Sequence, residues 1–166
     1  LRSLVGSEMC IRDSLSAFES LRKTGFTNVN VDLMWGLPNQ TVTEAIKDLK
    51  QAIALEPEHI SWYQLTIEPK TGFYKNRPKL PRSPTLTQIE EEGLHLLSEH
   101  HYLRYEISAF AQKSFECRHN LNYWNFGDYL GVGAGAHGKM TFPNRVTGHR
   151  NQVSQEFIKI TCLEHP

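Results

Sequence analysis

Chemically versatile side chains are concentrated in residues 117–138, which read CRHNLNYWNFGDYLGVGAGAHG. A single histidine in an aromatic, apolar surround is sufficient to ligate a haem iron. His119, followed by Tyr123 and Trp124, fits that requirement. The pair Cys117-x-His119 is too sparse for a structural zinc site, which needs four ligands. From the residues alone, a histidine that hydrogen-bonds within the fold is the favoured interpretation, and an axial ligand of haem is the alternative.

The glycines of the same segment allow a second interpretation. Gly131-x-Gly133-x-x-Ala136 formally matches the dinucleotide fingerprint GxGxxG/A. That fingerprint requires a strand before it and a helix directly after it. Here KMTFPN follows, which is β-prone and is interrupted by Pro143. A glycine-rich turn is the favoured interpretation, and a dinucleotide site would require a helix after Gly138.

An acidic residue, Asp32, lies in the middle of the alternating stretch VNVDLMW, residues 29–35, which predicts a strand. Strands of a parallel sheet are covered on both faces, so we expect Asp32 to be buried. A buried carboxylate costs several kcal/mol unless it is paired or bound. Asp32 is therefore either held by bonds within the fold or directed at a ligand inside a barrel, with Asn30 and Met34 on the same face.

The elements that must position these residues alternate along the chain. Strands are predicted at residues 29–35, 59–67 and 105–110; helices are predicted at 16–22, after a capping box of Thr41 and Glu44, and after a second capping box of Thr85 and Gln88. A long loop rich in proline and basic residues, 68–84, separates the second strand from the last helix. This order predicts an α/β protein with parallel strands, in a barrel or a doubly wound sheet.

Composition narrows the function classes. The chain has 166 residues, with 18 basic and 18 acidic side chains and no net charge, so we expect no nucleic-acid partner. No apolar run approaches the roughly 20 residues that cross a bilayer. Three widely spaced cysteines predict a reducing, cytoplasmic location. No CxxxCxxC motif occurs, so the chain carries no local cysteine set for an iron–sulfur cluster.

Five longer motifs occur in order: VDLMWGLPNQT, SWYQLTIEPKT, YEISAFA, CRHNLNYW and YLGVGAGAHG. Through them the chain, from about Phe18 to about Gln152, resembles the HemW-type haem chaperones. These are related to oxygen-independent coproporphyrinogen III oxidase, in the radical S-adenosylmethionine superfamily. The resemblance implies a partial (β/α) barrel with a 4Fe–4S cluster and S-adenosylmethionine at the carboxyl ends of the strands.

The same resemblance implies roles for particular residues. Asp32 matches the aspartate that contacts S-adenosylmethionine. His119, Asn120, Tyr123 and Trp124 match the HNxxYW motif of the haem-handling branch, with His119 as a candidate ligand of the haem iron. The cluster-binding CxxxCxxC is missing, so we assign no catalytic residue and expect no cluster or S-adenosylmethionine cleavage from these 166 residues alone.

The implied function is to bind haem and to transfer it to an acceptor protein, for which a membrane-associated partner is one option. The alternative is a coproporphyrinogen III oxidase, which carries out radical oxidative decarboxylation in porphyrin biosynthesis; HNxxYW favours the chaperone. Residues 1–14 resemble translated sequencing-adapter nucleotides, and we interpret the chain as a fragment. We expect residues 15–115 to be the carboxyl-terminal part of the barrel, and 116–166 to hold the HNxxYW and glycine-rich segment and the truncated start of a helical region.

Overall fold

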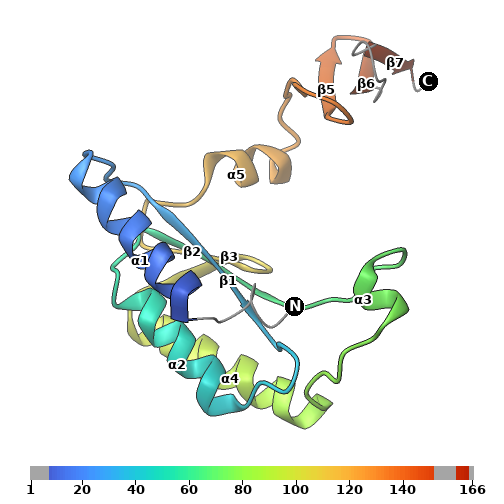
Figure 1. The fold of residues 1–166 in the computed structure, drawn as a ribbon. Helices are drawn as coiled ribbons and strands as arrows, with labels where there is room; N and C mark the ends of the chain where they lie inside the picture. The colour runs from blue at the N-terminus through green and yellow to red at the C-terminus, as the bar shows by residue number, and fades with distance from the viewer. Residues whose placement is uncertain (1–7, 152–159, 165–166) are drawn as a thin grey trace. The chain divides into compact units, whose positions relative to one another are not determined.

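The computed structural model describes residues 8–151 and 160–164, with side chains for residues 13–150. The chain forms two compact units that divide between Glu116 and Cys117 (Figure 1). Each unit has a sheet of its own. No helix in the described ranges is long and apolar enough to cross a membrane.

The first unit is a mixed α/β layer. Its sheet has the strand order β1-β2-β4-β3, made of β1 (Asn30–Trp35), β2 (His59–Gln64), β3 (Leu103–Glu106) and β4 (Ala109–Ala111). Its helices are α1 (Glu8–Lys23), α2 (Val42–Ile53), α3 (Gly72–Lys75) and α4 (Ser83–Glu99). Strands β1 and β2 are parallel and are joined through α2, which is the βαβ connection that the sequence predicts.

Helix α2 begins where its sequence predicts. The Thr41 hydroxyl accepts a hydrogen bond from the Glu44 backbone N–H at 3.3 Å, and the Glu44 carboxylate accepts one from the Thr41 backbone N–H at 2.8 Å. This reciprocal capping box pairs two N–H groups that would otherwise lack partners at the helix start. The bond from the Thr41 backbone N–H, and a second one from the Thr41 hydroxyl to the same carboxylate, lower the pKa of Glu44, with the backbone bond as the larger cause.

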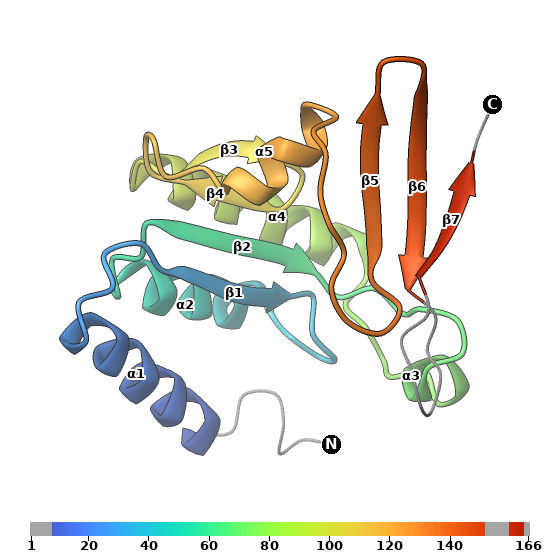
Figure 2. The same ribbon diagram turned by 90° about the horizontal axis from the view of Figure 1, so that it is seen from above.

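Helices α2 and α4 cover one face of the sheet, and the core lies between them and the strands (Figures 1 and 2). The fully buried residues include Leu49 of α2, Ile60 of β2, and Ile89 and Leu97 of α4. Trp35 and Trp62 stack in this layer with ring centroids 5.1 Å apart. Helix α1 is tied on by the Arg22 guanidinium, which donates to the Glu58 carboxylate at 3.0 Å.

The prediction of parallel strands is wrong beyond the first pair. Strand β4 pairs antiparallel with both β2 and β3, so only β1 and β2 run parallel in the described sheet. The single strand predicted at 105–110 is a hairpin, β3 and β4, with Ile107 exposed at its tip. Side chains hold this turn: the Arg104 guanidinium donates to the Ile107 carbonyl at 2.7 Å, and Glu106 accepts from the Ser108 N–H. The usual Gly, Asn or Pro turn signal is missing, which is why the sequence pattern hides it.

Three boundaries differ from their predicted positions. Helix α4 begins at Ser83 without a side-chain cap, and Pro84 occupies the first turn, where its missing N–H costs nothing. The predicted cap at Thr85 is therefore wrong. The loop 68–84 contains the short helix α3, capped by the Thr71 hydroxyl. Helix α1 begins at Glu8, inside the segment that was set aside as an artefact.

The second unit contains the helix α5 (Arg118–Trp124) and a three-stranded antiparallel sheet of β5 (His137–Phe142), β6 (Arg145–Asn151) and β7 (Ile160–Glu164). A strand follows the glycine-rich loop, so the helix that a dinucleotide fingerprint requires is absent there. The helical region expected toward the end of the chain is wrong for 160–164, which are a strand. Residues 152–159 lie outside the described ranges.

Candidate functional site

Polar side chains occupy the sheet face that points away from α2 and α4. Successive strand residues point to opposite faces, so Leu33 and Trp35 enter the core and Asn30 and Asp32 do not. The parallel register places Asn30 opposite His59 and Asp32 opposite Ser61 on that same face. We call this set, with Tyr105 of β3, the polar face of the first unit.

His59 is the centre of this polar face. Its Nδ1 lies 2.6 Å from Asn30 Oδ1, and its Nε2 lies 2.6 Å from the Tyr105 hydroxyl. Asn30 Oδ1 also accepts from the Ser61 hydroxyl at 3.1 Å. The other end of the Asn30 amide, Nδ2, donates to Asp32 Oδ1 at 2.8 Å. Side chains from three strands are thereby joined in one network.

The bonding pattern sets the protonation of His59. An amide oxygen only accepts, so the imidazole must carry its proton on Nδ1 and donate to Asn30. Nε2 is then the acceptor for the Tyr105 O–H. Burial lowers the pKa of His59 from its ordinary 6.5, against a smaller opposing effect of the Asp32 carboxylate. With only 4% of its surface exposed, His59 is a neutral imidazole at neutral pH.

Asp32 is exposed, so the expectation of a buried carboxylate is wrong. The reason is that helices cover β1 on one face alone in the described part of the chain, and Asp32 lies on the other face (Figure 2). Asn30 holds Oδ1 of Asp32. Among the described residues, nothing donates to Oδ2. Asp32 therefore presents one oriented acceptor oxygen.

Sequence reasoning missed His59, Ser61 and Tyr105 as members of this site. The alternation His59-x-Ser61 in HISWYQ was the available signal, because residues two apart on a strand share one face. Tyr105 could not be placed, because the hairpin that carries it was read as one strand.

The HNLNYW residues of the second unit form the helix α5, which the sequence reasoning did not predict. A helical turn brings His119 and Tyr123 together, with ring centroids 4.7 Å apart in an edge-to-face arrangement. Tyr123 in turn lies against Tyr129, at 4.6 Å. The spacing of four residues between histidine and tyrosine was the signal that could have revealed this stack.

Three aromatic side chains that follow His119 in the chain are exposed. The exposed fraction is 44% for Tyr123, 58% for Trp124 and 83% for Phe126. His119 is exposed too, and within the described residues neither of its ring nitrogens makes a hydrogen bond. Asn120 is half-buried. The HNxxYW residues thus share one short helix, with the imidazole of His119 against the ring of Tyr123.

The loop after α5 is fixed by bonds within the second unit. Asn122 Nδ2 donates to the Asp128 carbonyl at 3.1 Å, and Gly127 lies so close to Asn122 that a Cβ would be 2.0 Å from its amide oxygen. The Asp128 carboxylate accepts from the Thr141 N–H at 2.8 Å and from the Lys139 ammonium at 3.3 Å. These bonds lower the pKa of Asp128, with the Thr141 backbone bond as the largest cause.

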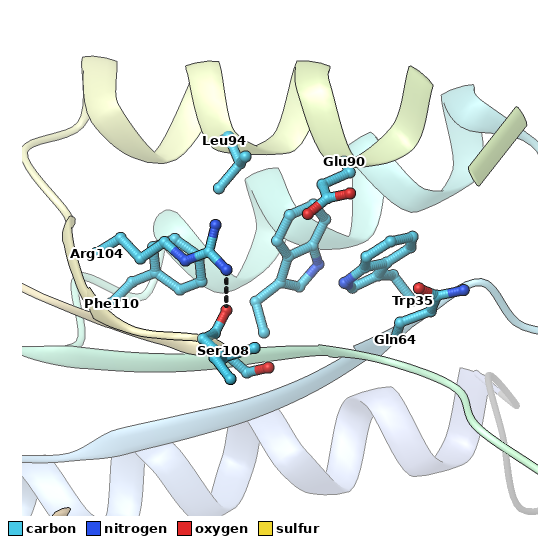
Figure 3. A pocket seen from close by; sticks show the side chains of 9 residues that line it. Trp35, Gln64, Glu90, Leu94, Arg104, Ser108 and Phe110 are labelled. Carbon is cyan, nitrogen blue, oxygen red and sulfur yellow. Dashed lines mark hydrogen bonds between the residues drawn. The ribbon is translucent and has the colours of Figure 1, made fainter. Parts of the chain in front are cut away.

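A small pocket of about 110 Å³ lies on the helix-covered face of the first unit, between α4 and the sheet (Figure 3). Trp35 and Gln64 line it together with Glu90 of α4. Trp62 Nε1 is buried here without a hydrogen-bond partner in the described residues. Strand alternation places this pocket on the face opposite Asp32, so it contains none of the predicted site residues.

Relatives cover most of this chain. It is 56% identical over 154 residues to the "Heme chaperone HemW" of Haemophilus influenzae, covering 93% of this chain and 38% of that protein. The Escherichia coli "Heme chaperone HemW" is 55% identical, over 72% of this chain and 32% of that protein. The Bos taurus "Radical S-adenosyl methionine domain-containing protein 1, mitochondrial" is 33% identical, over 90% of this chain and 35% of that protein.

A solved structure shares the fold. The coproporphyrinogen III oxidase (HemN) of Escherichia coli, described as a radical SAM enzyme, matches 82% of this chain and 34% of its own, with a TM-score of 0.65 and 22% identity. No protein-family model matches the chain. The chain spans about a third of the length of these curated relatives.

Proposed function

Because the chain belongs to the HemW family of radical S-adenosylmethionine proteins, we propose that the whole protein binds haem and delivers it to an acceptor protein. The observation that carries this proposal is the exposed imidazole of His119 on the ring of Tyr123, in a short helix whose next aromatic residues are also exposed. The names of the relatives support the same chemistry, since they describe haem chaperones.

The α5 segment has the features that a porphyrin requires. A porphyrin is planar and largely apolar, so it gains free energy by covering exposed rings such as Trp124 and Phe126. The imidazole of His119 is a suitable axial ligand, because its nitrogens are open and its ring is oriented by Tyr123. We assign Asn120 to the same site on the strength of its place in the motif and on α5.

We propose that Asp32 contacts S-adenosylmethionine. Its Oδ2 accepts no hydrogen bond from the described residues and fits a ligand that offers hydroxyl or ammonium donors, as S-adenosylmethionine does. Together with a reduced 4Fe–4S cluster, S-adenosylmethionine supplies radical chemistry when it is bound. The cluster would need cysteine ligands beyond those of this sequence, which has no CxxxCxxC motif.

We further propose that the first unit, residues 15–115, is part of a (β/α) barrel whose interior is the polar face. The parallel pair β1–β2 with α2 outside, and the likeness to the radical SAM fold, support this arrangement. Residues 116–166 are then a separate haem-handling unit. A cytoplasmic location and an acceptor protein of unassigned identity, either soluble or membrane-associated, complete the proposal.

The rival function is oxidative decarboxylation of coproporphyrinogen III. The structural likeness to that oxidase concerns the fold, whereas the high identities are to haem chaperones. The HNxxYW residues on α5 also favour the chaperone. Conversion of coproporphyrinogen III to protoporphyrinogen IX by the cluster-reconstituted whole protein would overturn the chaperone proposal.

The experiment for haem binding is a Soret-band titration of the whole protein with haem. We expect His119→Ala to weaken haem affinity at least about tenfold, equivalent to about 1.4 kcal/mol, because an axial ligand is lost. His95→Ala, an exposed histidine of α4, is the matched control and should leave the titration unchanged. An unaltered Soret titration for His119→Ala would remove His119 from the haem site.

A further inference from the structure

We propose that His59 is a positioning residue for ligand binding at Asp32, and that it acts through the side-chain amide of Asn30. This inference rests on the proposed role of Asp32 toward S-adenosylmethionine. It adds a residue to which the motif comparison assigns no role, and which touches no ligand itself.

The first step is that His59 sets the orientation of the Asn30 amide. An asparagine amide can be turned by 180°, which exchanges its donor and acceptor ends. Two donors, His59 Nδ1–H at 2.6 Å and the Ser61 hydroxyl at 3.1 Å, converge on the same atom of Asn30. The opposite end of the amide faces the Asp32 carboxylate, which only accepts, and must be the NH₂ group, so the atom that meets His59 and Ser61 is the oxygen.

The second step is that the oriented amide holds Asp32. Asn30 Nδ2 donates to Asp32 Oδ1 at 2.8 Å, which fixes the rotation of an otherwise exposed carboxylate. Oδ2 is left as the acceptor that can receive a donor from the ligand. If the amide were turned, its oxygen would face Asp32 Oδ1 and the two acceptors would repel each other.

The third step is that His59 itself is rigid. Its ring is 4% exposed and lies edge-to-face on Tyr105, with centroids 5.5 Å apart. With the proton of the imidazole on Nδ1, the Tyr105 hydroxyl donates to Nε2 at 2.6 Å. Burial lowers the pKa of the imidazole, and the negative charge of the Asp32 carboxylate raises it by less. A buried imidazole held in one orientation can support a binding group, because a binding side chain keeps its position when the side chains around it are fixed.

The experiment measures S-adenosylmethionine affinity of the whole protein by isothermal titration calorimetry, with S-adenosylhomocysteine as a second probe. Asp32→Ala comes first and should weaken binding of both. His59→Gln places its amide near the old Nε2 position and loses the donor to Asn30, so affinity should fall about fivefold, the worth of one hydrogen bond. His59→Asn keeps an N–H at the Nδ1 position and should restore affinity to within about twofold of the unsubstituted protein. Tyr102→Phe is a matched control, because it removes a buried hydroxyl bond to Pro57 in the same unit but outside the network.

The outcomes separate the two proposals. If Asp32→Ala leaves affinity unchanged, the proposed role of Asp32 fails. If Asp32→Ala weakens binding but His59→Gln and His59→Asn behave alike, the positioning role of His59 fails. Nitrogen-15 NMR of His59 in the unsubstituted protein is independent of any variant: a protonated Nδ1 and an unprotonated Nε2 are expected, and the opposite tautomer overturns the inference.

Discussion

The residues that carry the candidate chemistry differ in how they are held. Asp32 and His119 are exposed, yet each is oriented by one neighbour, Asn30 in one case and Tyr123 in the other. His59 is the reverse, a buried group with both nitrogens bonded. An exposed, oriented group that can still form a hydrogen bond is suited to ligand binding. A buried group whose donors and acceptors are all bonded is suited to holding a neighbouring side chain in place.

Gly93 of α4 provides a test of packing at the scale of one residue. A Cβ there would lie 2.0 Å from Cη2 of Trp62, so the close approach of helix and strand depends on the missing side chain. Alanine improves helix propensity by about 1 kcal/mol. Overpacking costs about 1–3 kcal/mol or more, and with ring carbons this close we expect the overpacking to prevail.

We therefore expect Gly93→Ala to lower the free energy of unfolding by about 2 kcal/mol, measured by urea denaturation. Gly72→Ala in α3 is the matched control, since no atom lies within 4 Å of its added Cβ. It should be neutral or slightly stabilising. Equal stability of the two variants would show that Trp62 can move aside at little cost.

At the scale of elements, the local rules for helix caps and turns explain where some helices and strands begin and end, but not all. Helix α2 obeys its capping box, whereas α4 begins without a side-chain cap because Pro84 fits the first turn. The β3–β4 turn relies on Arg104 and Glu106 in place of turn-forming residues. The two helices matter to the site because they cover one face of the sheet and leave the polar face to the strands.

The capping box gives the prediction at this scale. Thr41→Ala removes the acceptor for the Glu44 N–H and should cost about 1 kcal/mol of stability. The matched control is Thr43→Ala. Thr43 is exposed and is the second residue of α2, so this change should be neutral or slightly stabilising. Thermal unfolding followed by circular dichroism makes the comparison; equal melting temperatures for both variants would mean that α2 is held by packing alone.

At the scale of the whole molecule, the chain consists of two compact units with separate sheets. The candidate S-adenosylmethionine contact lies in the first unit and the candidate haem residues lie in the second. Each unit has tryptophan reporters: the stacked Trp35 and Trp62 in the first, and Trp124 in the second. Damage to one unit can therefore be followed separately from damage to the other.

Gly138→Ala is the test at this scale. A Cβ at Gly138 would lie 1.9 Å from the His149 ring, so this ring must leave its place over the opposite residue of the β5–β6 pair. We expect the second unit to lose stability, seen in Trp124 fluorescence, while the near-ultraviolet circular dichroism of the Trp35–Trp62 pair is retained. Gly148→Ala is the matched control in the same strand pair, because the nearest atom to its added Cβ is the Gly138 carbonyl oxygen, 4.0 Å away. Simultaneous loss of both signals would mean that the units unfold as one.

The parts of this protein that sequence patterns predicted correctly are those set by near neighbours. The alternation in residues 29–35 produced β1, and the three-residue spacing of Thr41 and Glu44 produced the start of α2. The HNxxYW motif was recognised by its resemblance to a family, and the helix α5 that its residues form was not predicted.

Only the folded chain decided the rest. The exposure of Asp32 depends on which face of β1 the helices cover, and the role of His59 depends on Asn30 and Tyr105, which are 29 and 46 residues away. Strand register and the turn between β3 and β4 bring these groups within hydrogen-bond distance. Such contacts arise from packing over long sequence separations, and local propensity carries no information about them.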